Sequence, residues 1–252
     1  MRSSRSVALE MLDEMAADDP GAQRSRRDLQ RIHRAMGTCA IIVREWRSSR
    51  SAFDYASPLR VLEIGAGDGS LMLRVARALG PQQRPVALTL LDRLNLVERQ
   101  TVDDYAALGW TVASRVADIH DWAGQGIDGA AIEAQDARWH LIIANLFLHH
   151  FDEEFLRVLL RALAARASGF LAVEPRRSAL ALAGSRLVGA LGANAVTRND
   201  AVLSVRAGFR DSELTRLWPM PQADWTLREY PAGLFSHCFG ALRGKRDAAD
   251  RL

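Results

Sequence analysis

The chain contains 252 residues, of which 48% are hydrophobic and 25% charged, the mixture of an ordinary globular protein. Its length suits one α/β domain with additional elements and excludes two large domains. No apolar run is long enough to span a bilayer, and no uninterrupted hydrophobic segment of signal type opens the chain, so we expect a cytoplasmic protein.

The formal net charge is +3, and the basic residues are interleaved with Asp and Glu. We therefore expect no nucleic-acid partner. The densest basic segment, residues 24–34, is interrupted by Asp28 and is interpreted as a solvated helix face, with a phosphate-binding patch as the alternative. Cys39 and Cys238 are far apart and have no ligand-like neighbours at metal spacing, so reduced thiols and no metal site are expected.

Helical and strand patterns alternate in the first part of the chain. Apolar residues at helical intervals predict two helices, over 7–15 and 28–46, separated by Asp-Pro-Gly at 19–21. The predicted strands are 60–64, 86–91, 110–116 and 141–144, and the predicted helices between the first three are 69–79 and 94–107. This alternation predicts a parallel sheet with helices on both faces.

The later part of the chain continues the alternation with an insertion. A predicted helix over 152–167 leads into a strand over 169–173. Residues 176–210 are rich in Ala, Leu, Gly and Arg and predict one or two helices above the carboxyl-terminal edge of the sheet. The remaining predicted elements are a helix over 211–218 and two strands, 225–230 and 235–242, joined by residues 231–233.

The most informative segment is residues 61–70, Val-Leu-Glu-Ile-Gly-Ala-Gly-Asp-Gly-Ser, which joins a buried-strand pattern to three glycines and then to a helix. Glycine permits positive φ and lets a ligand approach the backbone, and the next helix presents its N-terminal amides there. The spacing G-x-G-x-G differs from the G-x-G-x-x-G of dinucleotide sites. Glu63, two residues before the first glycine, favours a cationic ligand over a phosphate.

This segment resembles motif I of the class I S-adenosylmethionine-dependent methyltransferases, whose ligand carries a sulfonium and an ammonium. The resemblance implies a Rossmann-like, seven-stranded, mostly parallel sheet with an antiparallel last strand, helices on both faces and S-adenosylmethionine as cofactor. We expect an N-terminal helical cap and substrate region over 1–56, and a cofactor-binding domain over 57–252 with the helical insertion at about 176–210.

Acidic residues follow the second and third predicted strands, at the strand ends where open α/β sheets bind ligands. The resemblance assigns Asp92 to the ribose hydroxyls and Asp118 to the adenine amine, with Ile119 packed on the ring. A helix cap and a surface turn are the respective alternatives for the two aspartates. Trp122 either covers the base or anchors a loop. The residues expected to bind the cofactor are Glu63, Gly65, Ala66, Gly67, Gly69, Asp92, Arg93, Asp118, Ile119, Asn145 and Leu146.

Residues 144–151, Ala-Asn-Leu-Phe-Leu-His-His-Phe, follow the fourth predicted strand. Small-molecule methyltransferases of the ubiquinone-biosynthesis and polyketide-tailoring type carry a similar run, beside the sulfonium methyl. A histidine takes a proton from a hydroxyl near neutral pH. We therefore expect His149 and His150 to be catalytic, with His149 favoured. The alternative is that one of the pair caps the next helix or packs beneath it.

The implied reaction is an in-line displacement in which positioning provides most of the catalysis. The expected acceptor is a hydroxyl of a phenolic, quinone-like or polyketide metabolite, because the Asn-Pro-Pro-aromatic sequence of related N-methyltransferases is absent at 145–148. The residues expected to bind this substrate are His33, Met36, Phe147 and Arg176. His33 is otherwise a packed or surface histidine. Glu174 and Arg176, which end the strand over 169–173, either hold a polar group of the substrate or form a structural ion pair.

Two other functions remain open for this chain. The first alternative is an accessory or assembly protein that retains the methyltransferase fold. The second is an RNA or protein methyltransferase. A monomer and a homodimer are equally compatible with the sequence.

Overall fold

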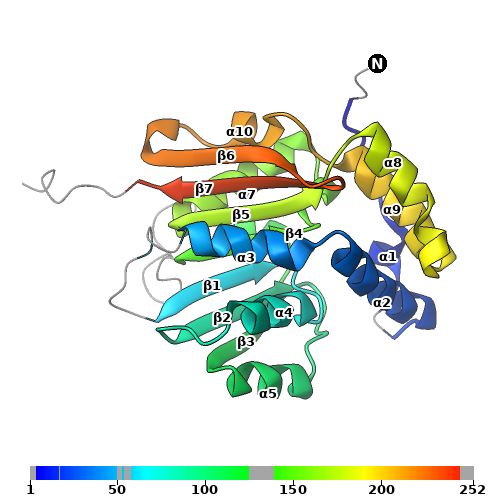
Figure 1. Cartoon of the computed structure of the whole chain (residues 1–252). Coiled ribbons are helices and arrows are strands. Elements are labelled where there is room, and N and C mark those ends of the chain that lie inside the picture. Colours follow the sequence, from blue (N-terminus) through cyan, green and yellow to red (C-terminus); the bar gives the residue numbers. More distant parts are fainter. Residues whose placement is uncertain (1–3, 17, 50–52, 54–57, 125–138, 245–252) are drawn as a thin grey trace, which may run out of the picture.

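The computed structural model describes residues 4–16, 18–49, 53, 58–124 and 139–244. Its centre is a seven-stranded sheet with the strand order β3-β2-β1-β4-β5-β7-β6 (Figure 1). The strands are β1 Leu59–Ile64, β2 Val86–Asp92, β3 Trp110–Val116, β4 Leu141–Asn145, β5 Gly169–Pro175, β6 Trp225–Ala232 and β7 Ser236–Arg243. Strands β1 to β5 are parallel to one another, and β7 runs antiparallel to both β5 and β6. This confirms the predicted fold class.

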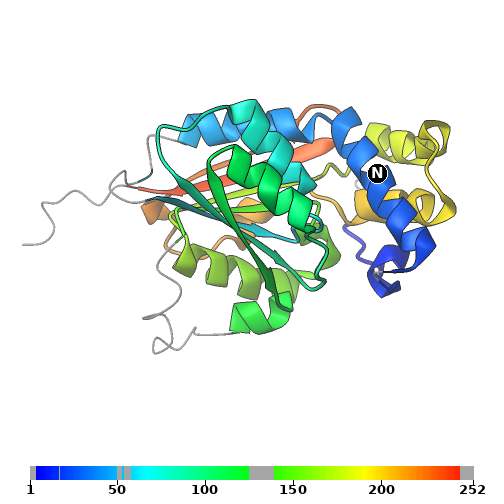
Figure 2. The same cartoon turned by 90° about the horizontal axis from the view of Figure 1, so that it is seen from below.

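Helices cover both faces of the sheet and gather beyond one of its ends (Figures 1 and 2). The α-helices are α1 Met11–Glu14, α2 Pro20–Ala35, α3 Thr38–Ser49, α4 Ser70–Leu79, α5 Arg99–Ala107, α6 Ile119–Gly124, α7 Glu153–Arg166, α8 Ala179–Arg186, α9 Ala195–Ala207 and α10 Glu213–Leu217. The short 3-10 helices are η2 Leu148–His150, η3 Val188–Leu191 and η4 Gln222–Asp224. No helix within the described ranges combines the length and the apolar character needed to cross a membrane.

Alternating side chains of the central strands enter two separate cores, as the period of two along a strand requires. Val61 and Ile143 pack with residues of α3, α4 and α5 on one face. Leu62 and Ile142 pack with residues of α6 and α7 on the other. In Figure 2, α3 and α4 accordingly lie on one side of the sheet and α7 on the opposite side. Burial on both faces leaves the ends of the strands as the place for a site.

Beyond the carboxyl ends of the parallel strands, α1, α2, α8, η3 and α9 form a group that we call the cap (Figure 1). Buried carboxylates join its helices. The Oδ2 atom of Asp28 on α2 accepts hydrogen bonds from the Asn194 N–H, at 2.9 Å, and the Thr197 hydroxyl, at 3.4 Å. Asp200 on α9 accepts from the N–H groups of Met11 and Leu12, both at 3.0 Å. The cap is therefore connected by polar contacts between segments far apart in the chain.

The N-terminal helices differ from those predicted. The single helix predicted over 28–46 is two helices, because Gly37 has φ +69° and turns the chain between α2 and α3. Helix α2 also begins earlier, at Pro20, where the Asp19 side chain accepts from the Gly21 N–H at 2.7 Å. As a result α3 packs on the sheet, while α2 belongs to the cap.

The helix predicted over 7–15 is also wrong in extent. Only the single turn α1 is helical, and residues 4–10 have no helical structure. This segment is instead held by long-range contacts: the Arg5 guanidinium donates to the carbonyl oxygens of His149, Phe151 and Ala207 at 3.2, 2.5 and 2.8 Å. Tertiary contacts override the helical periodicity here.

Two further boundaries shift beside the strand ends. The helix predicted over 94–107 starts only at Arg99, because Leu94 and Leu96 form a loop whose alternating side chains line a cavity. Helix α6 was not predicted. It begins beside Asp118, whose Oδ1 accepts from the His120 N–H at 2.7 Å.

Candidate active site

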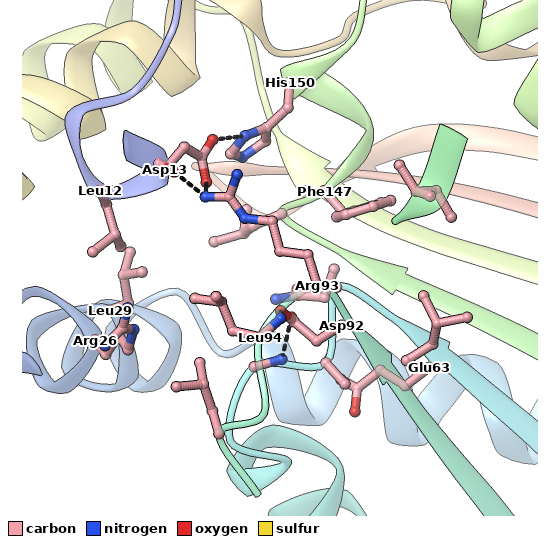
Figure 3. A pocket seen from close by; sticks show the side chains of 18 of the residues that line it. Leu12, Asp13, Arg26, Leu29, Glu63, Asp92, Arg93, Leu94, Phe147 and His150 are labelled. Carbon is pink, nitrogen blue, oxygen red and sulfur yellow. Dashed lines mark hydrogen bonds and ion pairs between the residues drawn. The ribbon is translucent and has the colours of Figure 1, made fainter. Parts of the chain in front are cut away.

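A cavity of about 360 Å³ lies at the carboxyl ends of β1, β2, β3 and β4, facing the cap. Its wall includes the loops that follow these four strands and also residues of the N-terminal segment (Figure 3). Most residues predicted to bind the cofactor line it: Glu63, Gly65, Ala66, Gly67, Asp92, Arg93, Asp118, Ile119, Asn145 and Leu146. The structure thus brings together strand ends that are far apart in the sequence.

The three glycines of the loop after β1 have φ between +57° and +73°, but their surroundings differ. A Cβ on Gly65 would lie 2.3 Å from Phe147 Cδ2, and one on Gly69 would lie 2.7 Å from Leu90 Cδ1. A Cβ on Gly67 would meet nothing within 4 Å. Gly65 and Gly69 therefore allow close packing of protein on protein, and Gly69 is outside the cavity lining. Gly67 is the position where backbone borders open space.

Glu63 on β1 reaches the same cavity from beneath the glycine loop. Its side chain is 2% exposed, and Oε2 has no hydrogen-bond partner among the described residues. Burial, together with the negative charges of Asp68 and Asp92, raises the pKa of this carboxyl well above its usual range. Such an arrangement is costly unless a donor or a cation pairs with the carboxyl group.

Asp92, the last residue of β2, uses both carboxylate oxygens to hold the loops around it. Oδ2 accepts from the Gly67 N–H at 2.8 Å, and Oδ1 accepts from the Leu94 N–H at 3.0 Å. The next residue, Arg93, reaches across the cavity and donates to the backbone and side chain of Asp13 (Figure 3). The carboxylate of Asp92 is therefore positioned directly beside the open Gly67.

Asp118 and Ile119 border the opposite edge of the cavity. Asp118 is exposed, and Ile119 at the start of α6 is 8% exposed. Trp122 lies outside the cavity lining: it is buried in the core, with the Arg166 guanidinium 4.5 Å above its ring. The tryptophan is thus a packing residue of α6.

The segment after β4 bends sharply into the cavity. Leu146 has φ +48°, a strained value for a residue with a branched side chain. The preceding Asn145 is 7% exposed, and its Oδ1 has no hydrogen-bond partner within the described part of the chain. Phe147 packs against Gly65. The bend places an unpaired amide oxygen and an aromatic ring side by side at the cavity wall.

Both predicted catalytic histidines follow this bend, and His149 is held by a glutamate of the neighbouring strand. His149 is 2% exposed, and its Nδ1 lies 2.8 Å from Glu174 Oε2. Glu174 also accepts from the N–H groups of Phe147 and Leu148 at 3.1 and 2.9 Å. Glu174 therefore fixes both the backbone of this segment and the imidazole orientation.

The N-terminal segment supplies two more carboxylates, which the sequence patterns did not indicate. Glu10 Oε1 lies 3.3 Å from His149 Nε2, and Asp13 Oδ2 lies 2.7 Å from His150 Nδ1. Burial lowers the pKa of His149, but the hydrogen bond with Glu174 and the negative charges of Glu174 and Glu10 outweigh it and raise the pKa to about 9. The same histidines hold the pKa values of Glu10 and Asp13 below their usual range, against the effect of burial. We call Glu10, Asp13, His149, His150 and Glu174 the histidine cluster.

A second, mostly apolar cavity of about 170 Å³ lies within the cap and adjoins the first. Leu12, Leu29 and Leu146 line both cavities. Met36, one of the predicted substrate residues, lines the second cavity. Glu10 of the histidine cluster also lines both cavities, so the second cavity, which we call the apolar chamber, adjoins the histidine cluster.

The remaining predicted substrate residues are divided. His33 and Phe147 line the first cavity. His33 Nε2 is buried without a hydrogen-bond partner among the residues described, and burial followed by the Arg74 charge lowers the pKa of His33 to about 4. Arg176 lies outside the lining of both cavities, where its Nη1 donates to the Gly233 carbonyl at 3.4 Å.

No family model matches this chain, and no curated protein sequence matches it. Solved structures do resemble it. One is the plantazolicin methyltransferase BpumL in complex with SAH, with 14% identity, 90% of this chain and 92% of that chain covered, and a TM-score of 0.58. Another is the S-adenosylmethionine-dependent methyltransferase SibL in its apo form, with 18% identity, 95% and 64% covered, and a TM-score of 0.57.

A third is the magnesium protoporphyrin IX methyltransferase ChlM from Synechocystis PCC 6803 with bound SAH, with 14% identity, 92% and 91% covered, and a TM-score of 0.51. At these identities the likeness concerns the course of the chain in space. With the strand order and the antiparallel β7 already described, this chain has the fold of the S-adenosylmethionine-dependent methyltransferases.

Proposed function

We propose that this protein transfers a methyl group from S-adenosylmethionine to a hydroxyl of a small molecule. The observation that carries the proposal is the buried Glu63 carboxyl group, whose Oε2 is unpaired among the described residues at the edge of a cavity floored by the open Gly67. A buried, unpaired carboxyl group suits a ligand with positive charge and N–H donors. The methionine portion of the proposed cofactor carries two such cationic groups, a sulfonium and an ammonium.

The surrounding residues fit the rest of that cofactor. Gly67 offers a surface without a side chain, which allows a ligand to lie against the backbone. The Asp92 carboxylate beside it is suited to accept from ribose hydroxyls, and Asp118 and Ile119 line the cavity where a base would lie. The Oδ1 atom of Asn145 is a further unpaired acceptor on the methionine side.

When bound, S-adenosylmethionine supplies an electrophilic methyl carbon attached to a sulfonium. The chain's own residues then align the acceptor and exclude water. We place the acceptor oxygen beside His149 and His150, because these side chains line the first cavity where it adjoins the apolar chamber. Phe147 lines the same cavity and packs against Gly65 of the glycine loop.

The apolar chamber supports a hydrophobic acceptor, such as a phenolic, quinone-like or polyketide metabolite. Its lining includes Leu29 and Ile32 of α2, Met36 directly after α2, and Val188 of η3. Burying an apolar ring against such side chains stabilises a complex by about 25 cal/mol per Å² of apolar surface. The hydroxyl would then be directed to the polar histidine cluster.

Calorimetric titration with S-adenosylhomocysteine tests the cofactor site. In Gly67→Ala the added methyl group would enter the space proposed for the ligand, and we expect affinity at least tenfold weaker than wild type. Gly109→Ala is the matched control, because Gly109 also has positive φ, +76°, with nothing within 4 Å of an added Cβ, and lies outside both cavities. Equal affinities in the two variants would contradict the proposed cofactor position.

The acceptor class is tested by methyl transfer from labelled S-adenosylmethionine in a lysate of producing cells. We expect label in the small-molecule fraction. Label confined to RNA or protein would replace the proposal with a macromolecular methyltransferase. Binding of the cofactor without transfer to either fraction would favour an accessory protein.

A further inference from the structure

Both histidines of the histidine cluster are arranged in the same way. Each uses Nδ1 for a carboxylate: His149 Nδ1 is 2.8 Å from Glu174 Oε2, and His150 Nδ1 is 2.7 Å from Asp13 Oδ2. Each directs Nε2 to Glu10, at 3.3 Å from Oε1 for His149 and 3.9 Å from Oε2 for His150. Carboxylates that hold one ring nitrogen while the other is left for a ligand are typical of metal-binding histidines.

The three ligand-type atoms are close to metal-binding distances. One atom from each of Glu10, His149 and His150 lies within 4.8 Å of the other two. Zinc bound tetrahedrally at about 2.0–2.1 Å places its ligand atoms about 3.3–3.4 Å apart. The 3.3 Å between His149 Nε2 and Glu10 Oε1 already has this value, whereas His150 Nε2 lies 3.9 Å from the other oxygen of Glu10, Oε2. The cluster would hold one ion after the His150 side chain moves closer to the ligand atoms of Glu10 and His149.

A second observation also indicates a ligand. The His149 side chain is 3% exposed, and its Nε2 has no hydrogen-bond partner in the described structure, because its approach to Glu10 lacks hydrogen-bond alignment. Of the three carboxylates in the cluster, Asp13 is paired with Arg93, whereas Glu174 is completely buried and the Glu10 side chain is 13% exposed. Buried carboxylates need compensating positive charge. A divalent cation at this point would supply it and would occupy the unpaired nitrogen.

We propose that Glu10, His149 and His150 bind a divalent transition-metal ion of the zinc type. Two imidazole nitrogens and one carboxylate oxygen favour such an ion over calcium or magnesium, which prefer oxygen ligands. All three side chains line the first cavity, so a fourth coordination position faces it.

The role of the ion rests on the proposed function. The open position faces the place assigned to the acceptor hydroxyl, and a metal-bound hydroxyl loses its proton more readily than a free one. The proton passes to solvent or to a neighbouring carboxylate, and the acceptor oxygen is held as an anion. Glu174 and Asp13 are positioning residues, because they act through the two histidines.

The competing explanation is an ion pair in which a protonated His149 lies between Glu10 and Glu174. In that case a proton, not a metal, compensates the carboxylates. The same contacts would then be seen without any affinity for zinc beyond that of an ordinary surface histidine. A direct measurement of metal binding separates the two explanations.

The experiment titrates Zn²⁺ alone into the full chain, after removal of metal with a chelator, and follows heat release. The absorption spectrum of added Co²⁺ reports the coordination geometry. We expect one ion per chain and visible bands of four-coordinate cobalt. We expect Glu10→Gln, His149→Gln and His150→Gln each to weaken zinc binding more than a hundredfold, and Asp13→Asn to weaken it about tenfold. Circular dichroism verifies that each variant is folded.

His120→Gln is the matched control, because the His120 ring packs on Phe155, 3.8 Å between centroids, outside the cluster. It should bind zinc as wild type does. No stoichiometric binding by wild type, or equal affinity in His149→Gln and His120→Gln, would overturn the metal site and leave the ion pair. Should His149→Gln not fold, the cobalt spectrum of wild type decides alone, since a surface site gives no four-coordinate bands.

The measurement of zinc binding is independent of the cofactor assignment. Gly67→Ala should lose S-adenosylhomocysteine affinity and bind zinc as wild type does. Zinc binding without S-adenosylhomocysteine binding in wild type would refute the proposed function alone. The reverse result would refute the metal site alone.

Discussion

The two sides of the first cavity are built in different ways. The glycine side, formed by Glu63, Gly65, Gly67 and Asp92, comes from two neighbouring parallel strands and the loops that follow them. The histidine side is the histidine cluster, whose residues lie at positions 10, 13, 149, 150 and 174. The first depends on backbone conformation and the second on side-chain contacts between distant segments. Substitutions should therefore affect the two sides to different degrees.

The largest effect is expected on the histidine side from Glu174→Ala. This change removes the acceptor for the N–H groups of Phe147 and Leu148 and the buried partner of His149. Breaking such a buried network costs about 3–5 kcal/mol of the free energy of unfolding, measured by urea denaturation. Glu153→Ala removes only an exposed ion pair with Arg157 and should change it by less than about 0.5 kcal/mol. Similar losses of unfolding free energy in both variants would show that the Glu174 network contributes no more than an exposed ion pair.

An intermediate effect on the free energy of unfolding is expected from the protonation of His33 when the pH is lowered. This histidine lies near Arg74 and Asp68, beside the glycine side. Its pKa is about 4 in the folded state, against an ordinary value of 6.5. Between these values the unfolded chain takes up a proton that the folded chain does not, so stability falls as pH decreases from about 6.5 to 4 and is unaffected above. The shift corresponds to about 3 kcal/mol.

Urea denaturation of wild type and His33→Gln across this pH range measures the contribution. The difference between the two proteins should be constant above pH 6.5 and should change in favour of the variant on acidification. Parallel stability curves would show that His33 is accessible to solvent protons in the folded protein.

The smallest effect is expected where the N-terminal segment joins the cap. Asp200→Ala leaves the N–H groups of Met11 and Leu12 without their acceptor, at a local cost of about 1–2 kcal/mol. Amide hydrogen exchange at these two residues should accelerate about tenfold, while that of the glycine side stays unchanged. Asp103→Ala, at an exposed position of α5, is the control and should alter neither.

The difference between the two sides also explains what the sequence could predict. The sheet and the glycine side follow from local patterns: strand, glycine loop and helix are contiguous over 61–79. The segment 7–15 carried a helical pattern, yet only α1 within it is helical, and long-range contacts of Arg5 and Asp200 fix the chain on either side of residues 7–10. The sequence offered no signal that Glu10 and Asp13 meet the two histidines, because that meeting depends on how the cap docks on the sheet.

For the same reason, the roles of individual site residues could be predicted only in part from the sequence. Glu174 stood at a strand end with two interpretations, a ligand for substrate and a structural partner. The structure shows that it holds backbone N–H groups and an imidazole. The conformation of Leu146, with positive φ, has no signature in the residue type, since leucine rarely adopts it.

The position of Glu174 on β5 has a consequence for the order in which the molecule folds. The glycine side requires only β1, α4 and β2, which are consecutive in the chain, so it can form early through local contacts. The segment 147–149 gains its backbone partner only when β5 has paired with β4. An intermediate lacking β5 would therefore bear a glycine loop beside a disordered pair of histidines, and protection of the amides at 147–149 would mark the docking of the fifth strand.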